Sequence, residues 1–109
     1  RPIRSVNYTS CDKTTNSTFP SVYGKLGDTL LLSLAFDDRA ELNEFESPPG
    51  TELVNWIQGK DETGFLYTKT LDKKGETGQL VTLGPGGHYC KDAMISLVLR
   101  MNRTRRGDT

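Results

Sequence analysis

The stretch Gly27–Phe36, GDTLLLSLAF, decides the fold that the sequence predicts. Leu30, Leu32, Leu34 and Phe36 occupy every second position, so they share one face when the chain is extended. Eight residues between turn-forming glycine and aspartate residues make a run that is short for a helix. The stretch therefore predicts a β-strand that places Leu32 and Leu34 in the core.

Four further strands are expected downstream, separated by turns rich in glycine, lysine and aspartate. They cover residues 53–57, 65–71, 79–83 and 93–101. Leu97 and Leu99, which share one face of the last strand, are expected in the core. Several short strands at regular spacing predict an all-β antiparallel sandwich or barrel.

The composition fits one folded domain. The chain has 109 residues, of which 34% are hydrophobic before the eleven glycines are counted, so disorder of the whole chain is not expected. Residues 1–21 differ from the rest because they are polar and rich in Thr and Asn. We expect an irregular or edge segment over residues 1–21 and the domain proper over residues 22–109.

The charge balance bears on the partner. Fourteen basic residues match fourteen acidic ones, which argues against nucleic acid or an anionic membrane as the main partner. No apolar run approaches the roughly 18 residues that a membrane helix needs. Contact with a membrane is therefore expected only through segments outside this chain.

Three sequons for N-glycosylation lie at Asn7, Asn16 and Asn102, where the Asn, Ser and Thr content predicts about one by chance. The two cysteines, Cys11 and Cys90, are compatible with one disulfide that closes a long loop. The alternative is a pair of free buried thiols in a cytosolic protein. The excess of sequons favours a secreted protein or a cell-surface ectodomain.

The residue types that carry catalysis or metal binding do not form a known pattern. His88 is the one histidine of the chain, the acidic stretch 37–46 lacks the spacing of an EF-hand, and Cys90 has no supporting catalytic constellation. We therefore expect no catalytic residue, no metal site, no cofactor and no small-molecule substrate. A small β-barrel enzyme or ligand carrier is the alternative, and it would need converging polar groups.

In order and spacing, several segments resemble a variable-type immunoglobulin domain. Residues 27–34 resemble the family's B strand, residues 54–58 its C strand with the buried tryptophan, and residues 94–101 its E strand. Residues 102–109, which end in Asp-Thr, are similar to the family's E–F corner. The resemblance implies an immunoglobulin-like antiparallel β-sandwich with Trp56 in its core. A surface-exposed tryptophan is the alternative, and it would break the family pattern.

The chain also departs from the family. Leu34 stands where the family places its first core cysteine, which resembles the T-cell and signalling-lymphocyte adhesion receptors. The number of residues from Leu34 to Trp56 is larger than is usual between the B and C strands of the family. Strands F and G are expected to follow Thr109, to come from another chain, or to lie in a second fragment after cleavage at the furin-like stretch 103–106. A disulfide between Cys11 and Cys90 would be non-standard and would pin the N-terminal segment to the sandwich.

The resemblance implies a protein-binding module of a cell-surface or viral glycoprotein, acting in adhesion or immune recognition. The usual contact surface of the family is the sheet that carries the C strand and residues 65–71. On it we expect partner contacts from mixed charges and aromatics, namely Lys60, Asp61, Glu62, Phe65, Tyr67 and Lys69. Two alternatives are a structural domain with no partner of its own, and integrin binding through Arg106-Gly107-Asp108.

Overall fold

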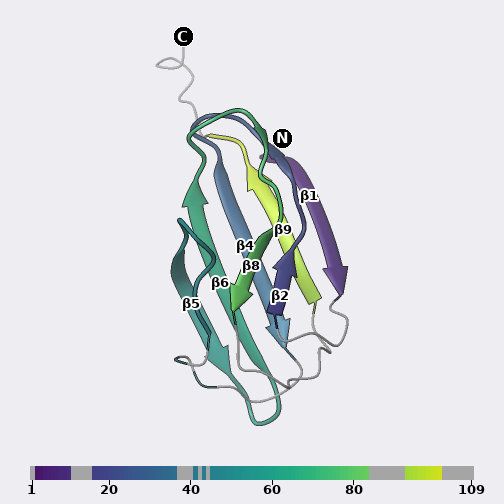
Figure 1. Cartoon of the computed structure of the whole chain (residues 1–109), viewed down its shortest axis with the longest axis vertical. Helices are drawn as coiled ribbons and strands as arrows, with labels where there is room; N and C mark the ends of the chain where they lie inside the picture. The colour runs from purple at the N-terminus through teal and green to yellow at the C-terminus, as the bar shows by residue number, and fades with distance from the viewer. Residues whose placement is uncertain are drawn as a thin grey trace.

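The computed structural model describes residues 2–10, 16–36, 41, 43, 45–83 and 93–101. These residues form antiparallel β-strands and connecting turns, with no α-helix among them. The strands lie in two layers (Figure 1), so the prediction of an all-β antiparallel protein is confirmed and the arrangement is compatible with a β-sandwich.

The larger layer is a five-stranded sheet in the order β1-β9-β4-β6-β5, antiparallel throughout (Figure 1). In that order its strands are β1 (Ile3–Ser10), β9 (Ala93–Leu99), β4 (Thr29–Phe36), β6 (Thr63–Thr70) and β5 (Glu52–Gln58). Strands β5 and β6 form a hairpin, whereas β9 reaches β4 and β1 from the far end of the chain.

The smaller layer consists of two short ribbons. One pairs β2 (Asn16–Phe19) with β8 (Leu80–Leu83), and the other pairs β3 (Tyr23–Gly24) with β7 (Gly75–Glu76). Figure 1 shows β2 and β8 crossing in front of the five-stranded sheet, and β2 contacts β9 across the gap. We call the side of the large sheet that faces these ribbons the inner face, and the opposite side the outer face.

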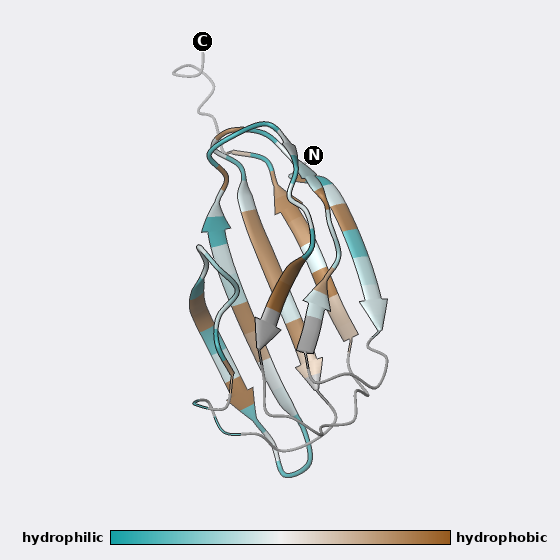
Figure 2. Ribbon diagram, viewed as in Figure 1, coloured by the Kyte–Doolittle hydropathy of each residue, from teal (hydrophilic) through white to brown (hydrophobic). Residues whose placement is uncertain are grey.

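The core lies between the two layers. Its buried apolar residues are Phe19, Val22, Leu30, Leu32, Leu34, Phe65, Tyr67, Leu71, Met94 and Val98. The alternation in β4 is confirmed, because every second leucine of that strand is at most 1% exposed. In Figure 2 the most hydrophobic ribbon runs along the neighbouring strands β4 and β9 and along β8.

The prediction for β9 is wrong about the face. Leu97 and Leu99 are only partly buried and lie on the outer face, while Met94, Ser96 and Val98 are buried. Both alternating sets of this strand are mostly apolar, so its own sequence does not select one of them. The pairing with β4 does, because it sets Val98 and Met94 opposite leucines of the core.

Trp56 packs against the core but is not fully buried. Its indole ring stacks on Phe65 with ring centroids 6.2 Å apart and an interplanar angle of 12°. Phe65 in turn stacks on Tyr67, with centroids 6.1 Å apart. These rings give the β5–β6 hairpin its attachment to the core, since a hairpin needs an apolar face packed against further structure.

The N-terminal residues belong to the same body as the rest. Strand β1 is one of the two edge strands of the large sheet, as the edge-segment prediction allows, and β2 lies in the second layer. Arg100 ties the start of β1 to the end of β9, because its backbone N–H donates to Pro2 O and its guanidinium donates to Ile3 O.

The strand order differs from the one that the immunoglobulin resemblance implies. A variable-type domain places its B and C strands in opposite sheets. Here β4, which resembles B, and β5, which resembles C, lie in one sheet with β6 between them. The pairing of β4 with β9, which resembles E, does agree with the family.

Candidate protein-binding surfaces

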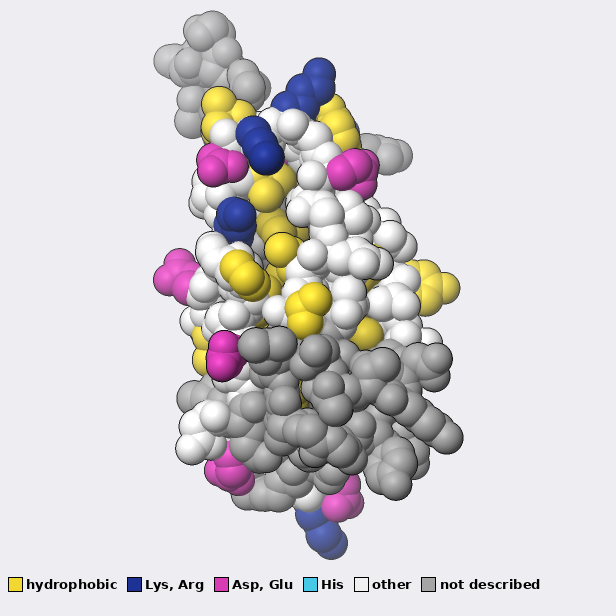
Figure 3. All heavy atoms as spheres, viewed as in Figure 1, with side chains coloured by type: hydrophobic (Ala, Val, Ile, Leu, Met, Phe, Trp, Pro, Cys, Tyr) yellow, Lys and Arg dark blue, Asp and Glu magenta, His cyan; other side chains and the backbone are white. Residues whose placement is uncertain are grey.

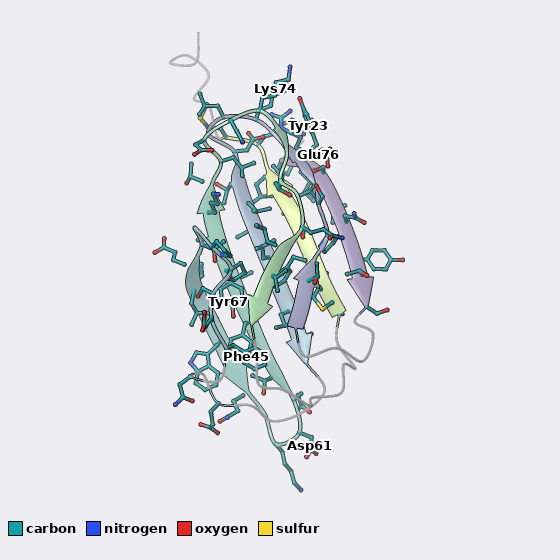
Figure 4. All side chains as sticks on the ribbon, in the orientation of Figure 1. Tyr23, Phe45, Asp61, Tyr67, Lys74 and Glu76 are labelled. Atoms are coloured by element: carbon teal, nitrogen blue, oxygen red, sulfur yellow. The ribbon has the colours of Figure 1, made fainter. Side chains whose placement is uncertain are left out.

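The tip of the β5–β6 hairpin carries three of the predicted partner contacts. Lys60, Asp61 and Glu62 are exposed, and a hydrogen bond of 2.7 Å from Gly59 N–H to Glu62 O closes the turn. Figure 4 shows Asp61 at one end of the molecule, with Lys74 and Glu76 at the other. The tip therefore presents mixed charges to solvent at the end of the sheet.

The other three predicted contacts do not join them on one surface. Phe65 and Tyr67 are 3% and 2% exposed, so the expectation that their rings meet a partner is wrong. Their positions alternate toward the inner face, where they stack on each other (Tyr67 is labelled in Figure 4). Lys69 is partly buried beside the turn at Gly50, where a Cβ on that glycine would lie 3.3 Å from Nζ.

The outer face of the large sheet carries an apolar surface that the sequence reasoning missed. Its residues follow from the strand register, because directly opposed residues in antiparallel strands share a face. Across the sheet they are Val6 and Tyr8 on β1, Ile95, Leu97 and Leu99 on β9, Leu31, Ser33 and Ala35 on β4, Gly64, Leu66 and Thr68 on β6, and Asn55 and Ile57 on β5.

Several of these side chains are open to solvent. Tyr8 is 78% exposed, Ile57 69%, Val6 57% and Ile95 39%. Among the described positions that point to this face, charge occurs at Glu52, at the start of the edge strand β5. A mostly apolar face with so little charge is characteristic of a surface that another molecule covers.

A shallow depression lies on the outer face where three strands meet. It has a volume of about 250 Å³, and its outer-face lining comes from Ser33, Ala35, Asn55, Ile57, Gly64 and Leu66. Gly64 opens it, because a Cβ at this position would come within 3.3 Å of Ile57 Cγ1. The lining is predominantly apolar, so the depression suits an apolar or aromatic side chain.

The inner face has a groove of a different kind. It has a volume of about 110 Å³ and combines Leu30, Leu71 and Leu80 with charged residues at its rim, among them Lys73 and Glu76. In Figure 3, which shows this side of the molecule, hydrophobic side chains form a strip along the upper half with acidic and basic groups around it. The charged rim favours contact with water, so this groove is the weaker candidate for an apolar partner.

A buried carboxylate organises the end of the sandwich away from the hairpin tip. Asp28 is 1% exposed, and its Oδ2 accepts from Arg4 Nε and, at 2.9 Å, from Lys25 N–H. Its Oδ1 accepts from Met101 N–H at 3.0 Å. The turn that presents it needs Gly27, whose φ of +89° favours glycine. One carboxylate thus joins β1, the turn before β4 and the segment after β9.

The electrostatics of Asp28 favour its charged form. Burial raises the pKa of this carboxyl, but the hydrogen bonds from Arg4, Lys25 and Met101 and the charge of Arg4 outweigh the burial. The pKa of Asp28 therefore lies below its ordinary value of 3.8. The cluster is structural in character, since every group in it is already engaged within the chain.

One predicted glycosylation site can be described in full. Asn7 is exposed on β1, where it pairs with Ser96 and its Nδ2 donates to Ser21 O at 3.1 Å. Asn16 lies on β2, and its side chain is outside the described part. Also outside the described residues lie Cys11, Cys90, His88, Asn102, the furin-like stretch 103–106 and Arg106-Gly107-Asp108.

The described part of the chain lacks two kinds of feature. Within residues 2–10, 16–36, 41, 43, 45–83 and 93–101, no three His, Cys, Asp or Glu side chains are grouped so that they could hold a metal ion. The same residues contain no helix with the length and apolar composition that crossing a membrane requires.

Comparison of the chain with protein-family models, with curated proteins and with solved structures finds no match in any of the three.

Proposed function

We propose that the protein is a binding module that recognises another protein through the outer face of its five-stranded sheet. The observation that carries this proposal is the exposed, nearly uncharged apolar surface around Tyr8, Ile57 and Ile95. Monomeric proteins seldom expose contiguous apolar surface of this kind unless it serves binding. Aromatic and aliphatic side chains at the centre of an interface supply most of its affinity.

The charged tip of the hairpin has a secondary part in this proposal. Lys60, Asp61 and Glu62 lie at the end of the same hairpin that carries Ile57. Exposed charges at the rim of an interface mainly affect the rate of encounter and the choice of partner. We expect them to select the partner that the apolar face then holds.

The setting that we propose is extracellular, as part of a cell-surface or viral glycoprotein that acts in adhesion or immune recognition. The support is the set of three sequons, of which Asn7 has an exposed side chain on an edge strand. Protein made in animal cells should lose mass on enzymatic deglycosylation, and Asn7→Gln should remove one glycan. No change in mass with either treatment would contradict the extracellular setting.

We also propose that the sandwich is related to the variable-type immunoglobulin class, with the β5–β6 hairpin moved into the sheet of β4. The support is the sequence pattern of residues 27–34, 54–58 and 94–101 and the pairing of β4 with β9. Backbone NOEs test this strand order. Contacts between Ser33 and Leu66 are expected for it, while contacts from β5 to a strand in the opposite layer, with none to β6 beside β4, would contradict it.

The binding function is tested by presenting the whole chain to a panel of cell-surface proteins that includes the chain itself. Ile57→Lys should weaken binding at least tenfold, because it sets an unpaired charge in an apolar interface. The matched control is Leu26→Lys, which changes a residue of similar exposure (67%) in the turn before β4. Equal losses for the two variants, or no binding to any member of the panel, would refute the proposal.

A further inference from the structure

The occupant of the outer face can be specified further, on the basis of the proposed binding function. We propose that this face binds a second copy of the chain. In this dimer the two sheets pack face to face about a twofold axis parallel to the strands. Tyr8 of each copy then lies over the depression beside Gly64 of the other.

The charge distribution is the first argument for a second copy. Charged residues make up 26% of the chain, yet the central positions of the outer face carry none. The surface that covers an uncharged apolar face must itself be largely uncharged, because unpaired charges are costly to desolvate. The outer face of another copy satisfies this requirement.

The available area is the second argument. Five strands spaced about 4.8 Å apart and some seven residues long form a face of about 20 by 25 Å. Two such faces in contact bury about 1,000 Å² of surface in total, and the uneven surface of the side chains adds to this area. That value reaches the lower limit for a specific protein interface, and two sheets pack in this way in ordinary β-sandwiches.

The third argument is that the face is complementary to itself. Tyr8 projects from β1 at one edge of the sheet, and the depression lies among β4, β6 and β5 toward the other edge. A twofold axis parallel to the strands exchanges the two edges, so it sets β1 of each copy over the β5–β6 side of its partner. A symmetric dimer interface requires this reciprocal contact.

The register places the projection and the depression at matching heights. Tyr8 pairs with Ile95, Ile95 pairs with Ser33, and Ser33 pairs with Leu66. Leu66 and Ser33 line the depression, so Tyr8 lies in the same row across the sheet. The depression of about 250 Å³ exceeds the 150 Å³ or so that holds a benzene ring, which leaves room for a phenol.

Among the sequons, the one at Asn7 has a described asparagine side chain, and it leaves the outer face accessible. Asn7 alternates with Tyr8 along β1 and pairs with the buried Ser96, so it is on the inner-face side. Its Nδ2 donates to Ser21 O, in the segment that leads to β3. A glycan on Asn7 would extend from that side and would not block the outer face.

The test is sedimentation velocity of the whole chain, glycosylated and at a series of concentrations. We expect a reversible monomer–dimer equilibrium in the unmodified protein. Tyr8→Ser and Gly64→Val should each weaken the dimer at least tenfold, since the first removes the projection and the second fills the depression. Leu26→Ser, at a residue of similar exposure away from the face, should leave the equilibrium unchanged.

Mixing the two variants tests the geometry. In a mixed dimer, Tyr8 of the Gly64→Val copy meets the intact depression of the Tyr8→Ser copy, and the filled depression faces the small serine. The mixture should therefore form more dimer than either variant alone. A dimer that is insensitive to Tyr8→Ser, or a mixture that forms no more dimer than the separate variants, would overturn the inference.

The outcomes separate this inference from the proposed function. If the unmodified chain stays monomeric at every concentration while Ile57→Lys abolishes binding of another protein, the inference is overturned and the binding function stands. If the chain is monomeric and outer-face variants change no binding, both are overturned.

Discussion

The two faces of the five-stranded sheet are alike in hydrophobicity and different in what they contact. On the inner face, Leu32 and Leu34 belong to the buried core that also contains Phe19 of β2, and each is 1% exposed. On the outer face of the same strand, Leu31 is only partly buried, and its cross-strand neighbour Leu97 is too. The difference shows that apolar side chains alone do not mark the core, because the packing over each face decides which of them are buried.

Truncation of one leucine on each side of β4 should give the largest contrast in stability. Leu32→Ala should lower the free energy of unfolding by about 3 kcal/mol, since it removes a fully buried side chain and leaves a cavity. Leu31→Ala, the matched variant on the outer face, should cost about 1 kcal/mol because its side chain is already partly exposed. Urea unfolding at low protein concentration measures both, and equal losses would contradict the assignment of faces.

The next largest effect on stability concerns Asp28, the buried carboxylate at the end of the sandwich away from the hairpin tip. Asp28→Asn should cost about 2 kcal/mol, because it removes the charge that Arg4 pairs with and sets an amide against a backbone donor. Asp61→Asn at the exposed hairpin tip is the matched control and should change stability little. Thermal unfolding of the two variants gives the comparison.

The sign of the pH dependence follows from the lowered pKa of Asp28. A carboxyl whose pKa is lower in the folded state stabilises the fold above its unfolded value of 3.8, and this contribution disappears as pH falls through the folded pKa. The unmodified protein should therefore lose stability below about pH 4 more steeply than Asp28→Asn. Identical profiles below that pH would exclude a role for the cluster in acid stability.

A smaller effect is expected within the inner face itself. Ser96 is 0% exposed, and its Oγ has no hydrogen-bond partner in the part of the chain that the structure describes. Ser96→Ala should raise the free energy of unfolding by about 1 kcal/mol, because an unpaired buried hydroxyl is costly. Thr18→Ala, at a partly buried position of β2, serves as a comparison and should give no such gain. A loss of stability in Ser96→Ala would indicate that the hydroxyl is paired after all.

The smallest effect should come from the exposed side chains of the outer face. Val6→Thr keeps the β-branched shape that suits a strand, and Val6 is 57% exposed. The free energy of unfolding of the monomer should change by less than about 0.5 kcal/mol. A much larger loss of stability at low protein concentration would mean that Val6 is buried by other parts of the same monomer. The outer face would then be part of the core, like the inner face.

Sequence reasoning succeeded where one alternating set was clearly more apolar than the other. In β4 the inner set includes Leu30, Leu32 and Leu34, while the outer set includes Ser33 and Ala35, so the period of two identified the core face. It failed in β9, where Met94 and Val98 compete with Ile95 and Leu97. A strand that is apolar on both sides takes its orientation from its partners.

The candidate binding surface was mostly beyond the reach of the sequence. The hairpin tip at Lys60–Glu62 was predicted as exposed, because charged turn residues between two strands face solvent. Phe65 and Tyr67 were expected on the same surface as the hairpin tip. In the sequence they alternate with Gly64 and Leu66, and this alternation does not say which of the two sets faces solvent. Only the packing of β2 and β8 over one face decides which of the two is buried.

By itself the sequence determined the strands β4, β5, β6, β8 and β9 and the antiparallel all-β class, because period-two patterns and turn residues act locally. The tertiary structure decided the order of those strands, the inner side of β9 and the meeting of Tyr8, Leu66 and Gly64 on one surface. These features depend on register between segments far apart in the chain. No local preference specifies that register.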